Sequence, residues 1–255
     1  MLIDYYEILI LSLIQGVSEF IPVSSSAHLY IISELLDFKN QSLMIDVGMH
    51  LGSLLAVLFY FRQDFLNIHK NRQILNLIII GSTPLILAGF IIYTTGLIDF
   101  VRNLKLLAWL SLIFAIVLYF ADKIKVTKKI DADLNLKTIL IIGLFQIASL
   151  FPGVSRSGIV ITAGRFLNFD RYDATKISFY LSVPAIAGAS FLSLKDVFTN
   201  DATFNSLIIL SVFLSFIFSY ITIKYFLIFI KNFNFNIFVI YRIILSLFIF
   251  YIIYS

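Results

Sequence analysis

Six long apolar segments constrain this chain more than any other feature of its sequence. They run roughly over residues 43–61, 73–97, 103–121, 174–194, 204–230 and 237–254. Each is about 20 residues or longer, the length at which a helix crosses the hydrocarbon core of a bilayer. In the whole chain 60% of residues are hydrophobic and 13% are charged, whereas about half of a soluble chain is apolar. The sequence therefore predicts an all-α polytopic membrane protein.

Two other regions, residues 7–36 and 137–168, are apolar at both ends and polar in the middle. The first polar island reads QGVSEFIPVSSSAH, and the second reads QIASLFPGVSRSGI. Each island contains a proline, which removes a backbone donor and disfavours helix in the preceding residue. We expect each region to form a re-entrant hairpin of two half-helices. Broken backbone at membrane depth requires a protein-lined cavity.

The two islands align without a gap at an offset of 131 residues. Gln15 matches Gln146 and Ser24 matches Ser155; the other matched pairs are Ser18–Ser149, Phe20–Phe151, Val23–Val154 and Ser26–Ser157. The same shift carries the first three apolar segments onto residues 174–192, 204–228 and 234–252, nearly the last three. We predict a single membrane domain with two repeats, 1–121 and 137–255, joined by a linker over 122–136. Three spans per repeat is an odd number, so the second repeat is expected to be inverted.

The basic residues predict the orientation. With both hairpins re-entrant, thirteen basic residues fall on one side of the membrane, namely Arg62, Lys70, Arg72, Lys123, Lys125, Lys128, Lys129, Lys137, Arg165, Arg171, Lys176, Lys224 and Lys231. Four fall on the other side, namely Lys39, Arg102, Lys105 and Lys195. Because basic loops remain inside, the larger group is expected in the cytoplasm and both termini outside. The linker at 122–136 is then cytoplasmic, and the two hairpin tips can meet near the midplane.

Gln15 and Glu19 are the first candidate site residues. Their spacing of four places them on one face of the first half-helix. A buried carboxylate needs a cation or a hydrogen-bond donor, and a divalent metal would serve. Both residues are therefore candidate metal ligands. The alternative is an interhelical hydrogen bond made by Glu19.

Three consecutive serines and a histidine follow. Ser24 stands where the N-cap of the second half-helix is expected, and Ser25 and Ser26 add two more hydroxyls. His28 lies one turn past Ser24 and Ser25, close enough to exchange a proton with a hydroxyl or a bound phosphate.

Arg156 is the most specific residue of the second island. It lies between Ser155 and Ser157 and follows Pro152-Gly153, at the start of a half-helix. A guanidinium binds phosphate oxygens through two parallel hydrogen bonds, and helix N-termini attract anions. These features predict a site for a multiply charged anion. The alternative is a structural ion pair with Glu19, which would still place both residues in one cavity.

Further residues fit less definite roles. Asp46 and His50, spaced by four, either line the same cavity or form a hydrated pair at the membrane interface. Arg242 begins the last span, where we expect its side chain to extend to the cytoplasmic surface. Because the chain contains no cysteine, disulfides and thiolate metal sites are excluded.

At these residues the chain resembles the bacterial undecaprenyl-diphosphate phosphatase family of the bacitracin-resistance type. The first signature of that family is matched by Gln15, Glu19, Pro22, Ser24, Ser25 and His28, and the second by Pro152, Gly153, Ser155, Arg156 and Ser157. Further similarity covers LGSLLAV (51–57), SVPAIAGA (182–189) and IYR (240–242). One position departs from the family pattern: the expected threonine is Val160, and the nearest hydroxyl belongs to Thr162.

The resemblance implies hydrolysis of undecaprenyl diphosphate to undecaprenyl phosphate, which recycles the lipid carrier of peptidoglycan synthesis and confers bacitracin resistance. It implies a location in the bacterial inner membrane, a polyprenyl diphosphate substrate, and a divalent cation, Mg²⁺ or Ca²⁺. No nucleic acid partner is expected, and the choice between monomer and homodimer stays open.

The residues then take particular roles. Arg156 would stabilise charge on the phosphoryl oxygens, and Glu19 with Gln15 would hold the metal or activate a nucleophile. Ser25 is the preferred nucleophile and His28 the acid–base group, while attack by water or by His28 itself stays open. Ser24, Ser26, Gly153, Ser155 and Ser157 would contribute to substrate binding.

Two other functions share part of this sequence pattern. A polyprenyl-phosphate transporter or flippase would also use inverted repeats with broken helices, but Ser, His, Glu and Arg at one point exceed what anion binding needs. The acid-phosphatase-like membrane superfamily has a similar PSGH motif but requires a histidine after its SR pair. Here no histidine follows Arg156.

Overall fold

Every secondary-structure element in the described part of the chain is a helix. The computed structural model describes residues 2–36, 38, 42–66, 72–96, 103–199 and 206–254. No named strand occurs in these ranges, which confirms the predicted all-α class. Lys39, Lys70 and Arg102, three of the residues behind the predicted orientation, lie outside the described residues.

The helices of the first part of the chain are α1 (Leu2–Ser18), α2 (Ser25–Leu36), α3 (Leu43–Tyr60), α4 (Arg62–Leu66), α5 (Arg72–Thr95) and α7 (Leu104–Asp122). Those of the second part are α8 (Ile130–Asp133), α9 (Leu136–Gln146), α10 (Arg156–Phe166), α11 (Arg171–Thr199), α12 (Ser206–Asn232) and α13 (Asn236–Tyr254). A 3₁₀ turn, Ile147–Leu150, extends α9. Both islands therefore break a helical hairpin at the predicted place, and in each hairpin the two half-helices pack against each other.

Among the described helices, five are long and apolar enough to cross a membrane, namely α3, α5, α7, α12 and α13. The sixth predicted span is the helix α11, which is not among these five. Its packing explains the difference, because α11 contacts α3, α5, α10 and α12 and buries polar side chains such as Thr175, Ser178 and Ser182. A helix surrounded by protein does not need the uniformly apolar surface of a lipid-facing one.

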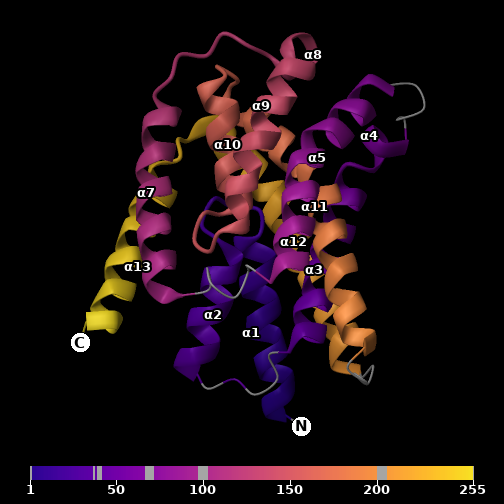
Figure 1. Cartoon of the computed structure of the whole chain (residues 1–255), viewed down its shortest axis with the longest axis vertical. Helices are drawn as coiled ribbons and strands as arrows, with labels where there is room; N and C mark the ends of the chain where they lie inside the picture. The colour runs from indigo at the N-terminus through magenta and orange to yellow at the C-terminus, as the bar shows by residue number, and fades with distance from the viewer. Residues whose placement is uncertain are drawn as a thin grey trace.

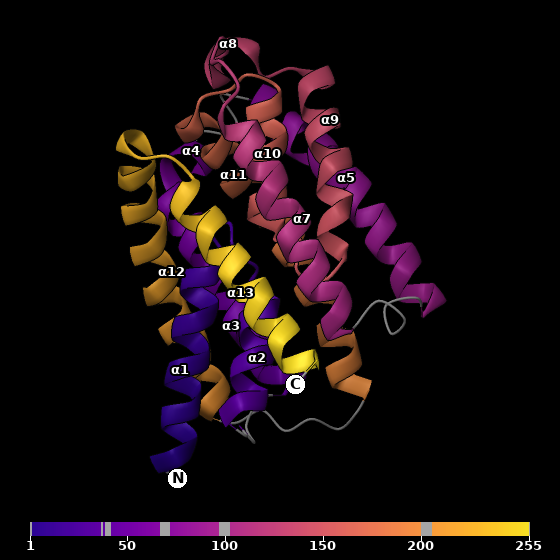
Figure 2. The same ribbon diagram turned by 90° about the vertical axis from the view of Figure 1, so that its left-hand side faces the viewer.

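The two hairpins lie at opposite ends of the molecule. Figure 1 shows α1 and α2 in its lower half and α9 and α10 in its upper half, with their tips converging in the interior. Figure 2 shows both chain termini towards one end and the α4 and α8 segments at the other. The inverted duplication stays a prediction, because the placement of two hairpins does not by itself show that the halves are repeats.

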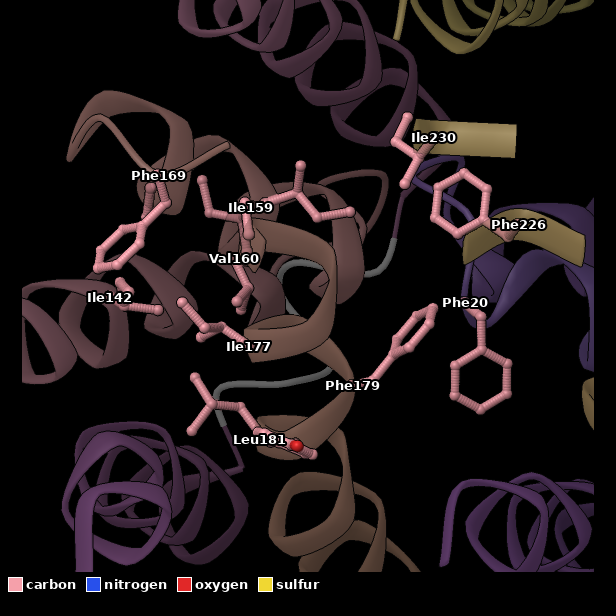
Figure 3. Close-up of a cluster of buried hydrophobic side chains, with 14 of the residues drawn as sticks. Phe20, Ile142, Ile159, Val160, Phe169, Ile177, Phe179, Leu181, Phe226 and Ile230 are labelled. Atoms are coloured by element: carbon pink, nitrogen blue, oxygen red, sulfur yellow. The ribbon is translucent and has the colours of Figure 1, made fainter. Parts of the chain in front are cut away.

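A core assembled from both parts of the chain holds the tips in place. Figure 3 shows Phe20, from the tip of the first hairpin, beside Phe179 of α11, with the two rings edge to face and their centroids 5.4 Å apart. Ile159 and Val160 of α10 belong to the same core. Burial of these side chains holds the backbone of the two polar islands in place.

Polar contacts join helices where side chains are small. Ser53 of α3 lies 3.1 Å from Ser215 and 2.9 Å from Ser219 of α12, measured between hydroxyl oxygens.

Asp122, at the end of α7, accepts two hydrogen bonds from Arg171 at 2.7 and 3.1 Å. Arg165 of α10 lies 3.4 Å from the same carboxylate. The end of the first half is thus tied to the second hairpin and to α11.

This arrangement predicts that the α8 segment and the C-terminus are exposed on opposite sides of the membrane. Because the chain lacks cysteine, single cysteines at Asp131 and Tyr254 can each be probed with a membrane-impermeant thiol reagent. We expect one to react in intact cells and the other only after the membrane is opened. Reaction of both from the same side would contradict the arrangement of the helices.

Candidate active site between the two hairpin tips

Glu19 is the centre of the polar cluster. It follows the end of α1, and its Oε1 accepts a hydrogen bond of 2.7 Å from Nη2 of Arg156, at the start of α10. Its Oε2 accepts from the Ser25 hydroxyl at 2.8 Å and from the Gln15 amide at 3.0 Å. The structure therefore joins four predicted site residues from the two islands around one carboxylate.

Main-chain carbonyls of α11 and of the first tip also accept hydrogen bonds from the second tip. Nη1 of Arg156 donates to the carbonyl of Ser178 in α11 at 3.1 Å. The Ser157 hydroxyl donates to the carbonyl of Ile21 in the first hairpin at 2.8 Å. Because these bonds use main-chain acceptors, they fix the direction of the guanidinium and the distance between the tips.

Ser24 and Ser155 give the two tips the same local geometry. Both have left-handed backbone conformations, with φ of 78° and 65°, and each directly precedes a half-helix. Such conformations are costly for residues other than glycine and are concentrated at functional sites. The Ser155 hydroxyl caps α10 by accepting from the Gly158 amide at 3.2 Å. Ser24 occupies the predicted position before α2, and its hydroxyl lies 3.4 Å from that of Ser26.

His28 lies in the site region, but its ring faces other groups than Ser25. Its Nδ1 is 2.7 Å from the Ser24 carbonyl, and its Nε2 is 2.5 Å from the Tyr241 hydroxyl of α13. Within the described residues no hydrogen bond joins His28 to Ser25. The structure thus places Glu19, and not His28, in contact with the preferred nucleophile. Sequence reasoning missed Tyr241, for which the only signal was its position in the IYR segment.

Arg242 does not extend to the cytoplasmic surface, so that expectation was wrong. Its side chain is 1% exposed and donates to the Gly153 carbonyl at 2.8 Å and the Val154 carbonyl at 3.4 Å. The unpaired carbonyls of the second tip attract the guanidinium inward, because that part of the backbone has no helical partner.

The remaining predicted residues lie around this centre. The Thr162 hydroxyl donates to the Gly158 carbonyl of its own helix at 2.6 Å, while Val160 is part of the apolar core. The Thr162 hydroxyl is therefore used within its own helix, and Val160 brings no hydroxyl to the cluster. His50 bonds to the carbonyl of Asp46 through its Nδ1 at 2.7 Å.

The residues present fit a divalent cation only if the substrate supplies further ligands. No group of three or more His, Cys, Asp or Glu side chains converges within the described ranges. However, Oε1 of Gln15 is buried and has no hydrogen-bond partner there, and it belongs to the residue that bonds Glu19. Mg²⁺ in particular is often held by one or two carboxylates together with substrate phosphates. Glu19 and Gln15 match this kind of site.

The fold and the cluster define a class of protein: a polytopic helical membrane protein with a partly buried Ser–Glu–Arg cluster where two broken hairpins meet. Residues 8–248 match the family described as bacitracin resistance protein BacA, and the chain belongs to this family.

Its relatives include proteins from three bacteria that are each named undecaprenyl-diphosphatase. The Pelagibacter ubique (strain HTCC1062) protein is 56% identical over 250 residues, covering 98% of both chains. The Elusimicrobium minutum (strain Pei191) protein is 42% identical and covers 93% of both. The Jannaschia sp. (strain CCS1) protein is 35% identical over 98% of this chain and 99% of its own.

Gly153 is predicted to be required for the shape of the second tip. Its φ is +85°, and a Cβ there would lie 2.4 Å from the carbonyl oxygen of Leu107 in α7. Gly153→Ala should lower the stability of the purified protein by at least about 1–2 kcal/mol, from the left-handed conformation alone. Gly188→Ala, which meets no atom within 4 Å, is the matched control. Equal thermal unfolding temperatures in detergent for the two variants would contradict this role.

Proposed function

We propose that the protein hydrolyses undecaprenyl diphosphate to undecaprenyl phosphate and inorganic phosphate. Family membership and relatives of this name over nearly the whole chain support the proposal. The observation that carries it is the contact of Glu19 with both Ser25 and Arg156. It combines a hydroxyl, a base and an anion-binding group at one point. The protein is thus a multi-pass membrane hydrolase that recycles the lipid carrier of the cell wall and fits a role in bacitracin resistance.

Arg156 and the helix ends are proposed to bind the diphosphate. The guanidinium can place two parallel N–H groups on phosphoryl oxygens, and the N-termini of α2 and α10 begin at the tips beside it. Donors that are already in place when charge develops usually provide the largest catalytic effect. Binding of the anion would draw Arg156 away from Glu19 and leave the carboxylate more able to accept a proton.

Ser25 is proposed to attack the terminal phosphorus. Its hydroxyl already donates to Glu19 at 2.8 Å, so the proton moves to that carboxylate as the Oγ–P bond forms. The bond from phosphorus to the bridging oxygen breaks, and undecaprenyl phosphate leaves with that oxygen. Water then attacks the phosphoserine, releases inorganic phosphate and restores the Ser25 hydroxyl. His28 lies on the same face of α2 as Ser25, and in our proposal it takes the proton from this water.

Glu19 and Oε1 of Gln15 would hold a divalent cation, Mg²⁺ or Ca²⁺, against the substrate. When bound, such a cation neutralises charge on the diphosphate. The unpartnered amide oxygen of Gln15 supports this assignment.

The proposed location is the inner membrane of a bacterium, with both termini outside the cytoplasm. The excess of basic residues on the side of the linker supports this orientation. One chain is sufficient for the proposed chemistry, because the whole cluster comes from a single chain; a homodimer is not needed to complete it. A transporter would require the anion-binding groups but not the hydrogen bond from Ser25 to Glu19, so the cluster favours hydrolysis.

The direct test is phosphate release from undecaprenyl diphosphate by the purified protein. We expect turnover that a chelator abolishes and that Mg²⁺ or Ca²⁺ restores. Arg156→Lys keeps the charge but loses the planar pair of donors, and should lower kcat about 10²- to 10³-fold. The absence of phosphate release by the wild type would contradict the proposed function. A lysine variant within twofold of the wild type would show that Arg156 is structural.

The nucleophile can be identified by acid-quench trapping with substrate labelled in its terminal phosphate. We expect a labelled phosphoenzyme in the wild type and none in Ser25→Ala, whose turnover should also be lost. Ser24→Ala keeps the Ser25 hydroxyl and should still yield the intermediate. Near-normal turnover of Ser25→Ala would exclude serine attack and leave water or His28. Loss of the intermediate in a stable Ser24→Ala variant would identify Ser24 instead.

A further inference from the structure

One turn of α13 contacts both hairpins through two adjacent residues that the proposed reaction does not use. Tyr241 bonds to His28 of the first hairpin, and Arg242 bonds to the tip of the second. No other pair of neighbouring residues on α13 has hydrogen bonds to both hairpins among the described contacts. The helix α13 therefore lies against the site together with the two hairpins.

The Tyr241 contact determines the state of the His28 ring. Because Nδ1 faces the carbonyl oxygen of Ser24 at 2.7 Å, this nitrogen must carry a proton and donate it. In the neutral ring Nε2 is then the acceptor, and the Tyr241 hydroxyl, 2.5 Å away, donates to it. The two rings are also stacked, with centroids 5.5 Å apart and planes 11° from parallel. The contacts therefore fix both the tautomer and the orientation of His28.

Tyr241 is not a core residue that happens to lie beside His28. Tyr241 is 43% exposed and its ring is stacked on that of His28, so it is not enclosed in an apolar core that its hydroxyl would help to hold together. A hydroxyl aimed at a histidine from a partly exposed ring is better explained by the orientation of that histidine than by stability of the bundle.

Arg242 holds the same turn of α13 in register with the second tip. Its guanidinium is buried, and the described ion pairs give it no carboxylate partner. It donates instead to the carbonyls of Gly153 and Val154. These carbonyls precede Arg156 in the chain, and Arg242 follows Tyr241. The bonds of Arg242 therefore set the position of Tyr241 along α13 relative to the guanidinium of Arg156.

We propose that Tyr241 is a positioning residue that holds the His28 ring and passes the proton of the attacking water to its Nε2, and that Arg242 anchors it to the second hairpin. This inference rests on the proposed function for its kinetic consequences, but the hydrogen bond that it invokes can be tested without turnover. Tyr241 acts through His28 in this scheme: its hydroxyl gives its proton to Nε2 and takes one from the water in the same step, so the hydroxyl is unchanged afterwards.

The kinetic test compares Tyr241→Phe with Tyr251→Phe. Both remove one hydroxyl from a partly exposed tyrosine of α13, and Tyr251, 71% exposed, lies two to three turns away from the site. We expect Tyr241→Phe to lower kcat about 3- to 10-fold, the value of one hydrogen bond, with KM unchanged because His28 does not bind the diphosphate. Tyr251→Phe should match the wild type. The effect of Tyr241→Phe should disappear in a His28→Gln background, since its partner is then absent.

Additive losses in the double variant, or equal kcat for the two tyrosine variants, would overturn the positioning role. A change in KM alone would assign Tyr241 to substrate binding and would overturn it as well. Matching thermal unfolding temperatures for the two tyrosine variants will show that any kinetic difference does not come from loss of stability.

A spectroscopic measurement separates this inference from the proposed function. The chain has three histidines, so the ¹⁵N signals of His28 can be assigned by their loss in His28→Gln. We expect a protonated Nδ1 and an Nε2 whose signal moves in Tyr241→Phe but not in Tyr251→Phe. An Nε2 signal that is the same in the wild type and Tyr241→Phe would overturn the inference whether or not the protein releases phosphate. An inactive wild type with the expected signals would overturn only the proposed function.

Discussion

The ion pair between Glu19 and Arg156 is the interaction on which the rest of the site depends. Charged groups at membrane depth are costly unless each has a partner. Glu19 and Arg156 are 137 positions apart in sequence and belong to different hairpins. Their pairing requires both hairpins to be broken and both tips to meet. The Ser25 and Gln15 hydrogen bonds then satisfy the other oxygen of the same carboxylate.

The two tips share a backbone design but differ in the chemical groups they carry. Ser24 and Ser155, at matched positions, have the same left-handed conformation. At the offset of 131, however, Glu19 corresponds to Leu150, Ser25 to Arg156, and His28 to Ile159. The first hairpin therefore provides the carboxylate, the Ser25 hydroxyl and the imidazole, and the second provides the guanidinium. Neither hairpin has a complete site, so the chemistry exists only where they meet.

The helices around the tips differ in what they contact. Those that face lipid, such as α5 and α7, are apolar over their whole length. The supporting helix α11 differs, because it buries polar side chains such as Thr175 and Ser182 against protein. In α11 the Ser178 carbonyl holds Arg156, and in α13 Tyr241 and Arg242 each hold one hairpin. The helix α13 is itself apolar enough to cross a membrane, and its Tyr241 and Arg242 lie where it meets the tips.

The sequence by itself determined the helical class, the broken hairpins and the members of the central cluster. These follow from local rules, since apolar length predicts spans, proline predicts breaks, and costly polar residues in apolar surroundings mark a site. Only the tertiary structure decided which groups touch: that Ser25 faces Glu19 and not His28, that Arg242 is buried, and that Tyr241 reaches the imidazole. Such contacts join residues up to 213 positions apart. They depend on how helices cross and rotate, which the packing of the whole core sets and no local pattern contains.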